Sequence, residues 1–204
     1  MAVKLVKPIN HKKVVKITNQ DFEAKMRELR VNSDIAVAVS GGPDSLALMH
    51  LSYRYALNNN INLTVLSIDH GIRAESSKEI VWLEKIAKKN KINFYSTKLK
   101  KKINSSNTLS KARTLRYEAL SKYCNKKKIK FLLTAHHLDD EIENFLMRLI
   151  RGSGIKGLSS LKVKSRYKNT KLILVRPLLE YSKKSLIQYL SCLLYTSPSP
   201  RDEK

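Results

Sequence analysis

Short apolar runs that alternate with amphipathic segments constrain the fold of this chain more than any other feature. Five runs have the length and composition of buried strands, and they cover residues 35–39, 63–68, 94–99, 131–135 and 172–175. Around them lie segments with helical periodicity, at residues 18–29, 46–57, 77–90, 109–124, 139–150 and after 182. This alternation predicts right-handed βαβ units. We therefore expect an α/β, Rossmann-like fold with a five-stranded parallel sheet and helices on both faces.

The chain is expected to form one main domain with a short addition at each end. Its 204 residues are enough for one α/β domain, which we place at residues 31–190. Residues 1–30 form an N-terminal extension and a helix capped by Thr18. Residues 191–204 (SCLLYTSPSPRDEK) lose the Lys/Ile/Asn bias and resemble translated cloning sequence, so we expect a non-native or disordered tail on a truncated chain. A natural Ser/Pro linker is the alternative.

Composition points to a polyanionic partner. The chain has 40 Lys+Arg against 17 Asp+Glu, a formal net charge of +23, and such a field attracts nucleic acid. The alternative is that AT-rich coding inflates the lysine content of a solvated surface. Cys124 and Cys192 are too few and too far apart for a disulfide framework or a zinc site. No apolar run reaches the roughly 20 residues that span a bilayer, and no secretory signal precedes the domain, so we expect a cytoplasmic protein without membrane contact.

The segment after the first predicted strand has the features of a phosphate-binding loop. It reads Ser40-Gly41-Gly42-Pro43-Asp44-Ser45 and leads directly into a helix. A glycine-rich turn at a helix N-terminus presents backbone N–H groups and the positive end of the helix dipole to an anion. Asp44 can hold Mg²⁺ against phosphates. The loop is not a Walker A sequence, because the Lys-Ser/Thr ending is absent, and SGG on its own is also a common turn.

Two further strand ends carry unusual chemistry. Asp69-His70-Gly71-Ile72-Arg73 follows the second strand, and His136-His137-Leu138-Asp139-Asp140 follows the fourth. Ligands of parallel sheets bind beyond the carboxyl ends of the strands, where these segments would meet the Ser40–Ser45 loop. Histidine suits proton transfer near neutral pH, and a second carboxylate can share Mg²⁺. The alternatives are an ordinary turn for the first segment and an Asp139 or Asp140 N-cap for the second.

Two cationic segments complete the candidate site. Arg113 and Arg116 lie three residues apart on one predicted helix face, where they can clamp phosphate or an RNA backbone. Residues 151–158 (RGSGIKGL) follow the helix that starts near Asp139. An exposed basic stripe and a glycine C-cap are the respective structural alternatives.

The Ser40–Ser45 loop resembles the PP-loop of the ATP pyrophosphatases, which cleave ATP between its α- and β-phosphates. The order and spacing of five segments resemble the tRNA(Ile)-lysidine synthetases of that superfamily: SGGPDS, DHGIR, ARTLRY, TAHHLDDEIEN and RGSGIKGLSSL. The resemblance extends from about Ile35 to Leu179, and RGSGIKGL is its most discriminating piece. It implies the adenine nucleotide alpha hydrolase-like PP-loop fold.

The resemblance also implies a two-step ligase reaction. The C2 oxygen of cytidine 34, in the CAU anticodon of tRNA(Ile), attacks the α-phosphate of ATP and releases diphosphate. The ε-amine of L-lysine then attacks C2 and expels AMP, which leaves lysidine. A homodimer is compatible with the family.

Residue roles follow from the same resemblance. The implied ATP-binding residues are Ser40, Gly41, Gly42, Pro43, Asp44, Ser45, His70 and Arg113. Asp44 and Asp140 would hold Mg²⁺, and Asp44, Asp140 and His136 would be catalytic.

The sequence also departs from that family. Asn144 stands where the family usually has Thr, and the family's acidic-Ser-Asn segment and further arginines do not follow the RPLL sequence at residues 176–179. Two alternatives stay open, a tRNA thiolase that delivers sulfur to an adenylated base and an inactive nucleotide- or RNA-binding fragment. Thiolases commonly use catalytic cysteines, and the positions of Cys124 and Cys192 disfavour that chemistry.

Overall fold

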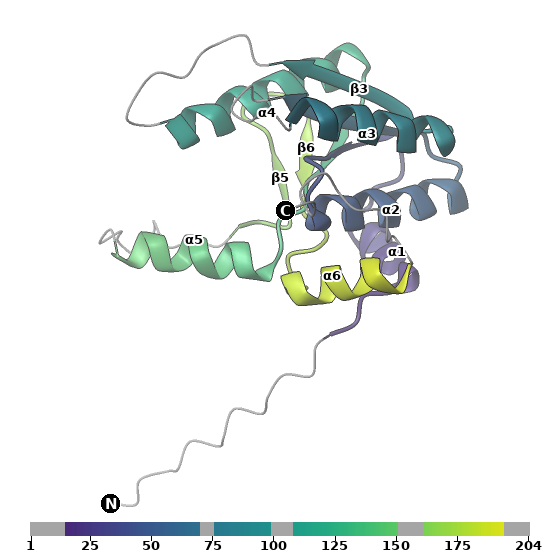
Figure 1. The fold of residues 1–204 in the computed structure, drawn as a ribbon. Coiled ribbons are helices and arrows are strands. Elements are labelled where there is room, and N and C mark those ends of the chain that lie inside the picture. The colour runs from purple at the N-terminus through teal and green to yellow at the C-terminus, as the bar shows by residue number, and fades with distance from the viewer. Residues whose placement is uncertain (1–14, 70–75, 99–107, 151–160, 194–204) are drawn as a thin grey trace, which may run out of the picture.

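The computed structural model describes residues 15–69, 76–98, 108–150 and 161–193. The helices in chain order are α1 (Asn19–Glu28), α2 (Pro43–Asn58), α3 (Ser76–Lys89), α4 (Thr108–Lys126), α5 (Leu138–Ile150) and α6 (Lys183–Cys192). The strands are β1 (Ile35–Ala38), β2 (Leu63–Asp69), β3 (Asn93–Lys98), β4 (Phe131–Leu133), β5 (Lys164–Arg166) and β6 (Ile173–Val175). Figure 1 shows their arrangement.

The strand order places a ligand crevice next to β1. The sheet runs β3-β2-β1-β4-β6-β5, and β1 pairs in parallel with both β2 and β4, through Ile35↔Leu63 and Ile35↔Phe131. The chain therefore winds outward in one direction from β1 to β3 and in the other direction from β4 onward. In doubly wound sheets the crevice opens at this reversal, beyond the carboxyl ends of the strands. Both the Ser40–Ser45 loop and the segment after β4 leave the sheet there.

The expected α/β fold is confirmed, with one strand more than predicted. β5 pairs antiparallel with β6 and makes the sheet six-stranded instead of five-stranded. Its sequence, Lys-Ser-Arg, has neither the apolar run nor the period-two pattern of a buried strand. The strand lies at the edge of the sheet, where lysine and arginine are common because only one side is paired. A strand of this kind cannot be identified from the pattern of apolar residues in the sequence.

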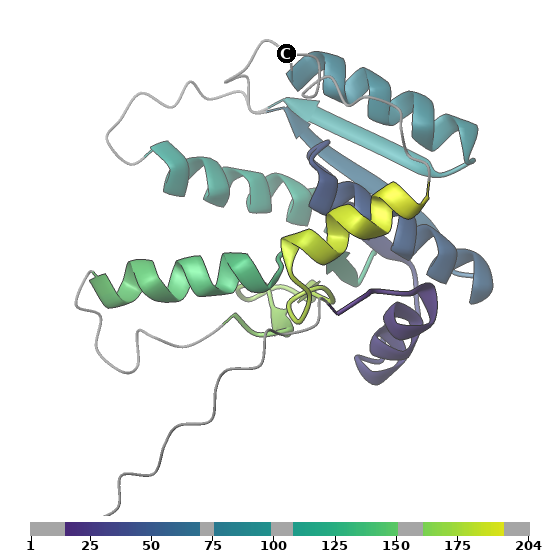
Figure 2. The same cartoon turned by 60° about the horizontal axis from the view of Figure 1, so that its bottom comes forward.

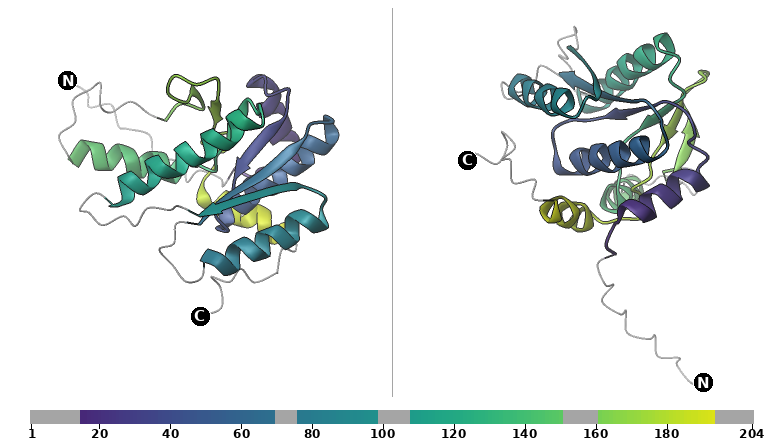
Figure 3. Two further views of the ribbon diagram at one scale, coloured as in Figure 1. Left: turned by 90° about the horizontal axis from the view of Figure 1, so that it is seen from above. Right: turned by 90° about the vertical axis from the view of Figure 1, so that its right-hand side faces the viewer.

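Two apolar clusters cover the two faces of the sheet. Along β1, Ile35 and Val37 belong to the larger cluster with residues of α1, α2, α3 and α6, while Ala36 belongs to the smaller cluster beneath α4. Figure 3 shows α2 and α4 on opposite sides of the strands. Because successive side chains point to opposite faces, a strand buried on both faces is apolar throughout. This explains why IAVA is recognisable from sequence.

Helix boundaries follow from local capping. Thr18 caps α1 as predicted, in a reciprocal pair with Asp21, and the Ser182 side chain accepts a hydrogen bond from the Ser185 N–H at the start of α6. α2 begins at Pro43, earlier than the predicted start at Leu46, because proline favours the first position of a helix. α6 ends at Cys192, inside the segment predicted as tail, and residues 194–204 lie outside the described residues.

α5 differs from the other helices in its packing. The helix is confirmed, but its apolar residues Ile142, Phe145, Leu146, Leu149 and Ile150 are exposed, Ile150 by 80%. Figures 1 and 2 show the reason, which is that α5 extends away from the sheet. Within the described ranges, no helix is both long and apolar enough to cross a bilayer.

Candidate active site

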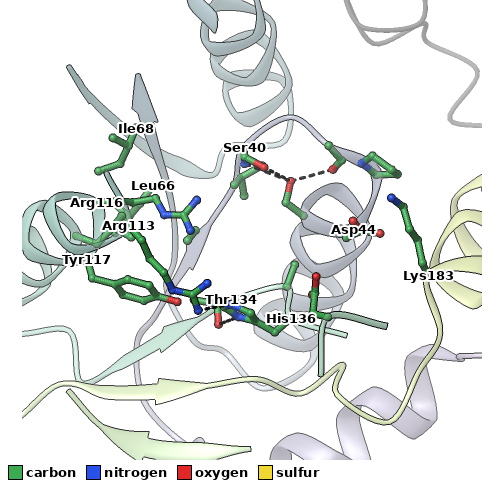
Figure 4. A pocket seen from close by; sticks show the side chains of 18 of the residues that line it. Ser40, Asp44, Leu66, Ile68, Arg113, Arg116, Tyr117, Thr134, His136 and Lys183 are labelled. Carbon is green, nitrogen blue, oxygen red and sulfur yellow. Dashed lines mark hydrogen bonds between the residues drawn. The ribbon is translucent and has the colours of Figure 1, made fainter. Parts of the chain in front are cut away.

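A pocket of about 380 Å³ lies at the carboxyl ends of β1 and β4. Its volume falls in the range of small-molecule sites. The lining comes from the Ser40–Ser45 loop, from α4, from the segment after β4 and from the start of α6. Figure 4 shows two sides with different chemistry, basic and aromatic side chains on one and the Ser40–Ser45 loop with Asp44 on the other.

The Ser40–Ser45 loop is shaped for an anion. Ser45 Oγ accepts a hydrogen bond from the Ser40 N–H at 3.2 Å and donates one to the Gly42 carbonyl at 2.8 Å, which closes the loop on itself. Gly42 is the N-cap of α2 and offers no side chain to its first N–H groups. Those donors and the positive end of the helix dipole are therefore available to a phosphate.

Glycine is required at position 41. Its φ of +80° is a conformation that other residues rarely adopt. A Cβ there would also lie 3.3 Å from Glu79 Oε2 on α3. The turn thus needs glycine for its backbone conformation, and a side chain there would also have to displace the carboxylate of Glu79.

Three carboxylates surround one imidazole in a cluster that we call the aspartate wall (Asp44, His137, Asp139 and Asp140), of which Asp44 and Asp140 line the pocket. His137 Nε2 lies 3.6 Å from Asp44 Oδ2 and 3.6 Å from Asp140 Oδ2, while its Nδ1 lies 3.6 Å from Asp139 Oδ2. His137 is only 5% exposed. Asp44 Oδ1 is buried and has no hydrogen-bond partner within the described part of the chain. A buried carboxylate oxygen without a partner is costly, so a ligand or cation at this atom would stabilise it.

His137 and Asp140 start α5 together. α5 begins at Leu138, so Asp139 and Asp140 lie in its first turn, and neither occupies the N-cap position that was the structural alternative to a functional role. The His137 N–H donates to Asp140 Oδ2 at 3.0 Å, and the Asp140 N–H donates to His137 Nδ1 at 3.4 Å. This is the reciprocal pattern of a capping box, formed here by an imidazole and an aspartate. Sequence reasoning did not select His137, although a polar residue three positions before an acid at a helix start was a usable signal.

The opposite side, the arginine wall, consists of Arg113, Arg116, Tyr117, Thr134 and His136. An Arg113 guanidinium nitrogen lies 3.0 Å from His136 Nε2, and Thr134 Oγ1 lies 3.0 Å from His136 Nδ1. Both guanidinium carbons lie 5.8 Å from the centre of the Tyr117 ring, a cation–π distance. α4 thus contributes both arginines to the pocket, as the sequence predicted.

These contacts determine the tautomer of His136. A guanidinium can only donate, so Nε2 accepts from Arg113 and the ring proton lies on Nδ1, which donates to Thr134 Oγ1. Burial, followed by the nearby charges of Arg113 and Arg176, lowers the pKa of His136 to about 4. The imidazole is therefore neutral near pH 7 with both nitrogens engaged. This geometry favours a role in orienting Arg113 over the proton transfer that the sequence suggested.

Arg176, the first residue of the RPLL sequence at residues 176–179, holds two parts of the sheet together. It is buried, and it donates to the Lys162 carbonyl at 2.7 Å and to Ser165 Oγ at 3.1 Å. Burial lowers its pKa, but guanidinium stays charged in proteins. Arg176 therefore ties β6 to the edge strand β5 and adds positive potential behind the arginine wall.

Most of the predicted site residues meet in this pocket. Those that line it are Ser40, Gly42, Pro43, Asp44, Ser45, Arg113, His136 and Asp140. Gly41 belongs to the same loop without lining the pocket. His70 and residues 151–158 lie outside the described residues, so their predicted contacts stay predictions. The polar lining residues that were not selected include Thr134, although it begins the TAHHLDDEIEN segment, and Lys183, which nothing in its local sequence marks.

The strand order, the glycine-rich turn into α2 and the pocket at the sheet reversal together define a nucleotide-binding α/β protein. The chain belongs to the PP-loop domain family, whose model matches residues 11–194. It is 46% identical over 159 residues to the tRNA(Ile)-lysidine synthase of Rickettsia bellii, covering 78% of this chain and 36% of that protein. It is 41% identical over 174 residues to the protein of the same name from Rickettsia typhi, covering 84% and 40%. The chain thus spans about two fifths of the length of these curated relatives.

Solved structures agree on the fold. The U34-tRNA thiolase NcsA from Methanococcus maripaludis superposes with a TM-score of 0.71 at 23% identity, covering 89% of this chain and 67% of that one. The NH3-dependent NAD synthetase from Campylobacter jejuni gives 0.57 at 15% identity, covering 91% and 77%. At such identities the likeness concerns architecture alone.

Proposed function

We propose that this chain is the ATP-using part of a tRNA(Ile)-lysidine synthetase, which adenylates cytidine 34 of tRNA(Ile) and joins L-lysine to it. One observation carries the proposal: the N-terminus of α2 and the carboxylates of Asp44 and Asp140 face one pocket of nucleotide size. The curated relatives of that name support the choice of reaction.

Adenylation makes chemical sense of the pocket. The C2 oxygen of cytidine is a poor leaving group, and its attack on the α-phosphate of ATP converts it into one that leaves as AMP. The first N–H groups of α2 bind phosphate oxygens, and Arg113 and Arg116 stabilise the negative charge that develops on the α-phosphate. His136 holds Arg113 in place for that contact. Lysine then attacks C2, and AMP departs.

The residues present fit a magnesium ion. Among the described residues, no group of three or more His, Cys, Asp or Glu side chains is arranged to hold a metal by itself. Mg²⁺ in nucleotide sites, however, uses one or two carboxylates and takes its other ligands from phosphates and water. Asp44, with its unpartnered Oδ1, and Asp140 would hold it. Bound there, Mg²⁺ would neutralise phosphate charge and promote departure of diphosphate.

The partners are part of the same proposal. The formal net charge of +23 supports a tRNA substrate, because positive charge attracts the phosphate backbone. L-lysine as second substrate, a cytoplasmic location and a homodimer stay predictions from the resemblance.

Cysteine chemistry does not favour the thiolase alternative. The chain has two cysteines. Burial raises the pKa of the Cys124 thiol to about 12, so it is not a nucleophile near neutral pH. Cys192 is exposed on the last turn of α6.

The test is diphosphate release from ATP with a tRNA(Ile) transcript that carries a CAU anticodon, with and without radiolabelled lysine. We expect release to require cytidine 34 and lysine to be incorporated into the transcript. A matched transcript with uridine at position 34 is the control. ATP binding without diphosphate release would favour the nucleotide-binding alternative, and release stimulated by a sulfur donor would favour the thiolase.

A further inference from the structure

Lys183 is a pocket residue that the chemistry above does not use. It is the first residue of α6 and lines the pocket beside the Ser40–Ser45 loop. Figure 4 shows its side chain on the Asp44 side, away from Arg113 and Arg116. Within the part of the chain that the structure describes, its ammonium group forms no ion pair with a carboxylate. A lysine in this position is available to an anionic ligand.

The backbone of Lys183 is anchored to the start of α5. Its N–H donates to Asp139 Oδ2 at 2.6 Å, and the Leu138 N–H donates to the Tyr181 carbonyl at 2.9 Å. Ser182 closes the first turn of α6 by accepting from the Ser185 N–H at 3.2 Å. The bonds from Lys183 to Asp139 and from Leu138 to Tyr181 join the start of α6 to the start of α5. The two neighbouring aspartates are therefore used differently, because Asp140 faces the pocket and Asp139 holds the residue that carries the ammonium group.

A protein cation at this end of the pocket would balance phosphate charge in addition to the Mg²⁺ proposed at Asp44 and Asp140. The Ser40–Ser45 loop contains no lysine, unlike a Walker A loop, in which lysine reaches the β- and γ-phosphates. Asp44 and Asp140 add negative charge where the triphosphate would bind next to α2. Arg113 and Arg116 lie on the opposite wall. Lys183 is the described pocket-lining cation on the same side as the loop.

We propose that Lys183 binds the β- and γ-phosphates of ATP and the departing diphosphate, and that Asp139 is the positioning residue that holds it there. The proposal rests on the ATP use proposed above. It requires neither tRNA nor lysine, so its test is separate from the test of lysidine formation.

The experiment compares the affinities of the full chain for ATP, diphosphate and AMP, each with Mg²⁺, by calorimetry. Because AMP lacks the β- and γ-phosphates, Lys183→Ala should weaken ATP and diphosphate binding about ten- to a hundredfold, as expected for a lost charge-assisted hydrogen bond. AMP affinity should stay within about twofold, and Lys183→Arg should retain most of the ATP affinity. The matched control is Lys184→Ala, which removes an exposed neighbouring lysine that does not line the pocket.

Asp139 is tested with the same ligands. Asp139→Ala should approach the ATP affinity of Lys183→Ala, and the double variant should be no weaker than Lys183→Ala, because both changes remove one interaction. Asp139→Asn should restore much of the affinity, since an amide oxygen can accept from the same N–H. Additive losses in the double variant would overturn the role of Asp139.

Three results would overturn the role of Lys183: an equal loss for ATP and AMP, no loss for either, or the same loss in Lys184→Ala. Failure of the unmodified chain to bind ATP would overturn it as well. Failure to form lysidine while ATP binding is intact would count against the proposed function alone.

Discussion

The arginine wall and the aspartate wall contain one residue each of a consecutive histidine pair, in opposite electrostatic surroundings. On the arginine wall, His136 accepts from Arg113 at 3.0 Å and is neutral, with its pKa lowered to about 4 by burial and by neighbouring cations. On the aspartate wall, His137 lies 3.6 Å from each of three carboxylates. Adjacent residues at a strand end point to different sides, so a single step along the chain separates the two environments.

The opposite charges of the two walls suit them to bind different parts of a metal-bound nucleotide. The arginine wall presents fixed cations, which stabilise anionic charge on a phosphate without reorganisation. The aspartate wall presents carboxylates, one of them with an oxygen that has no partner among the described residues, and this arrangement suits a cation. A phosphate-transfer site needs both, because the nucleotide binds through its own charge and through the metal it carries. Changes on the two walls should therefore have different consequences.

The largest effect is expected on the aspartate wall at Asp44. Asp44→Asn keeps the shape but removes the charge that we propose holds Mg²⁺. Tenfold more Mg²⁺ should restore diphosphate release only in part. At saturating ATP we expect release to fall about 10²- to 10³-fold, the scale of one preorganised electrostatic group. The control is Glu143→Gln, which changes an exposed carboxylate of α5 outside the pocket lining and should leave the rate unchanged. A loss below threefold in Asp44→Asn would remove the distinction between the walls.

The next effect concerns the arginine wall. Arg113→Ala should lower diphosphate release about 10²-fold, with little change in the Mg²⁺ dependence. His136→Ala should lower it about tenfold, because the guanidinium loses its acceptor. His136→Gln should recover part of the rate, since its carbonyl oxygen can replace Nε2. If the rate of the unmodified chain instead followed a titration near pH 6.5 that disappears in His136→Gln, His136 would be a proton-transfer group after all.

His137 should affect stability more than phosphate binding. His137→Ala removes the imidazole acceptor of the Asp140 N–H, which is one half of the reciprocal cap of α5, and leaves the carboxylates without their shared neighbour. We expect the free energy of unfolding to fall by about 1–2 kcal/mol, measured by urea denaturation. His137→Asn keeps a capping side chain and should lose less. Unchanged stability in the alanine variant would show that the cap contributes nothing.

The last effect, comparable in size to that of His137, is a pH dependence of stability at His136. Its folded-state pKa, about 4, lies below the ordinary value of 6.5, so the unfolded chain takes up a proton first as the pH falls. Its contribution to stability is complete above pH 6.5 and is lost as the pH decreases toward 4. Between pH 7 and pH 5 the unmodified chain should lose about 2 kcal/mol more than His136→Gln, the value that follows from a pKa of about 4 in the folded state. An equal loss of unfolding free energy in the two proteins, measured by urea denaturation at both pH values, would contradict the lowered pKa.

Much of this molecule could be predicted from sequence where the cause is local. The strand at Ile35–Ala38 is apolar throughout because both its faces are buried, and Thr18 and Asp21 identify the start of α1 within four residues. The Ser40–Ser45 loop was recognisable because glycines, a proline and a helix start follow one another. Residues of β5 carried no such pattern, because an edge strand is specified by its partner β6.

The sequence by itself determined the alternation of strands and helices, the phosphate-binding loop and the clustering of histidine and aspartate after β4. Backbone conformation and capping depend on neighbours within a few residues, so these features can be read from short segments. Only the tertiary structure decided that His136 meets Arg113, that His137 lies among three carboxylates and that Asp139 anchors Lys183. Each of these three arrangements involves at least one group from a distant segment: Arg113 beside His136, Asp44 beside His137, and Lys183 bonded to Asp139. Their geometry depends on how the helices pack on the sheet, which no local pattern records.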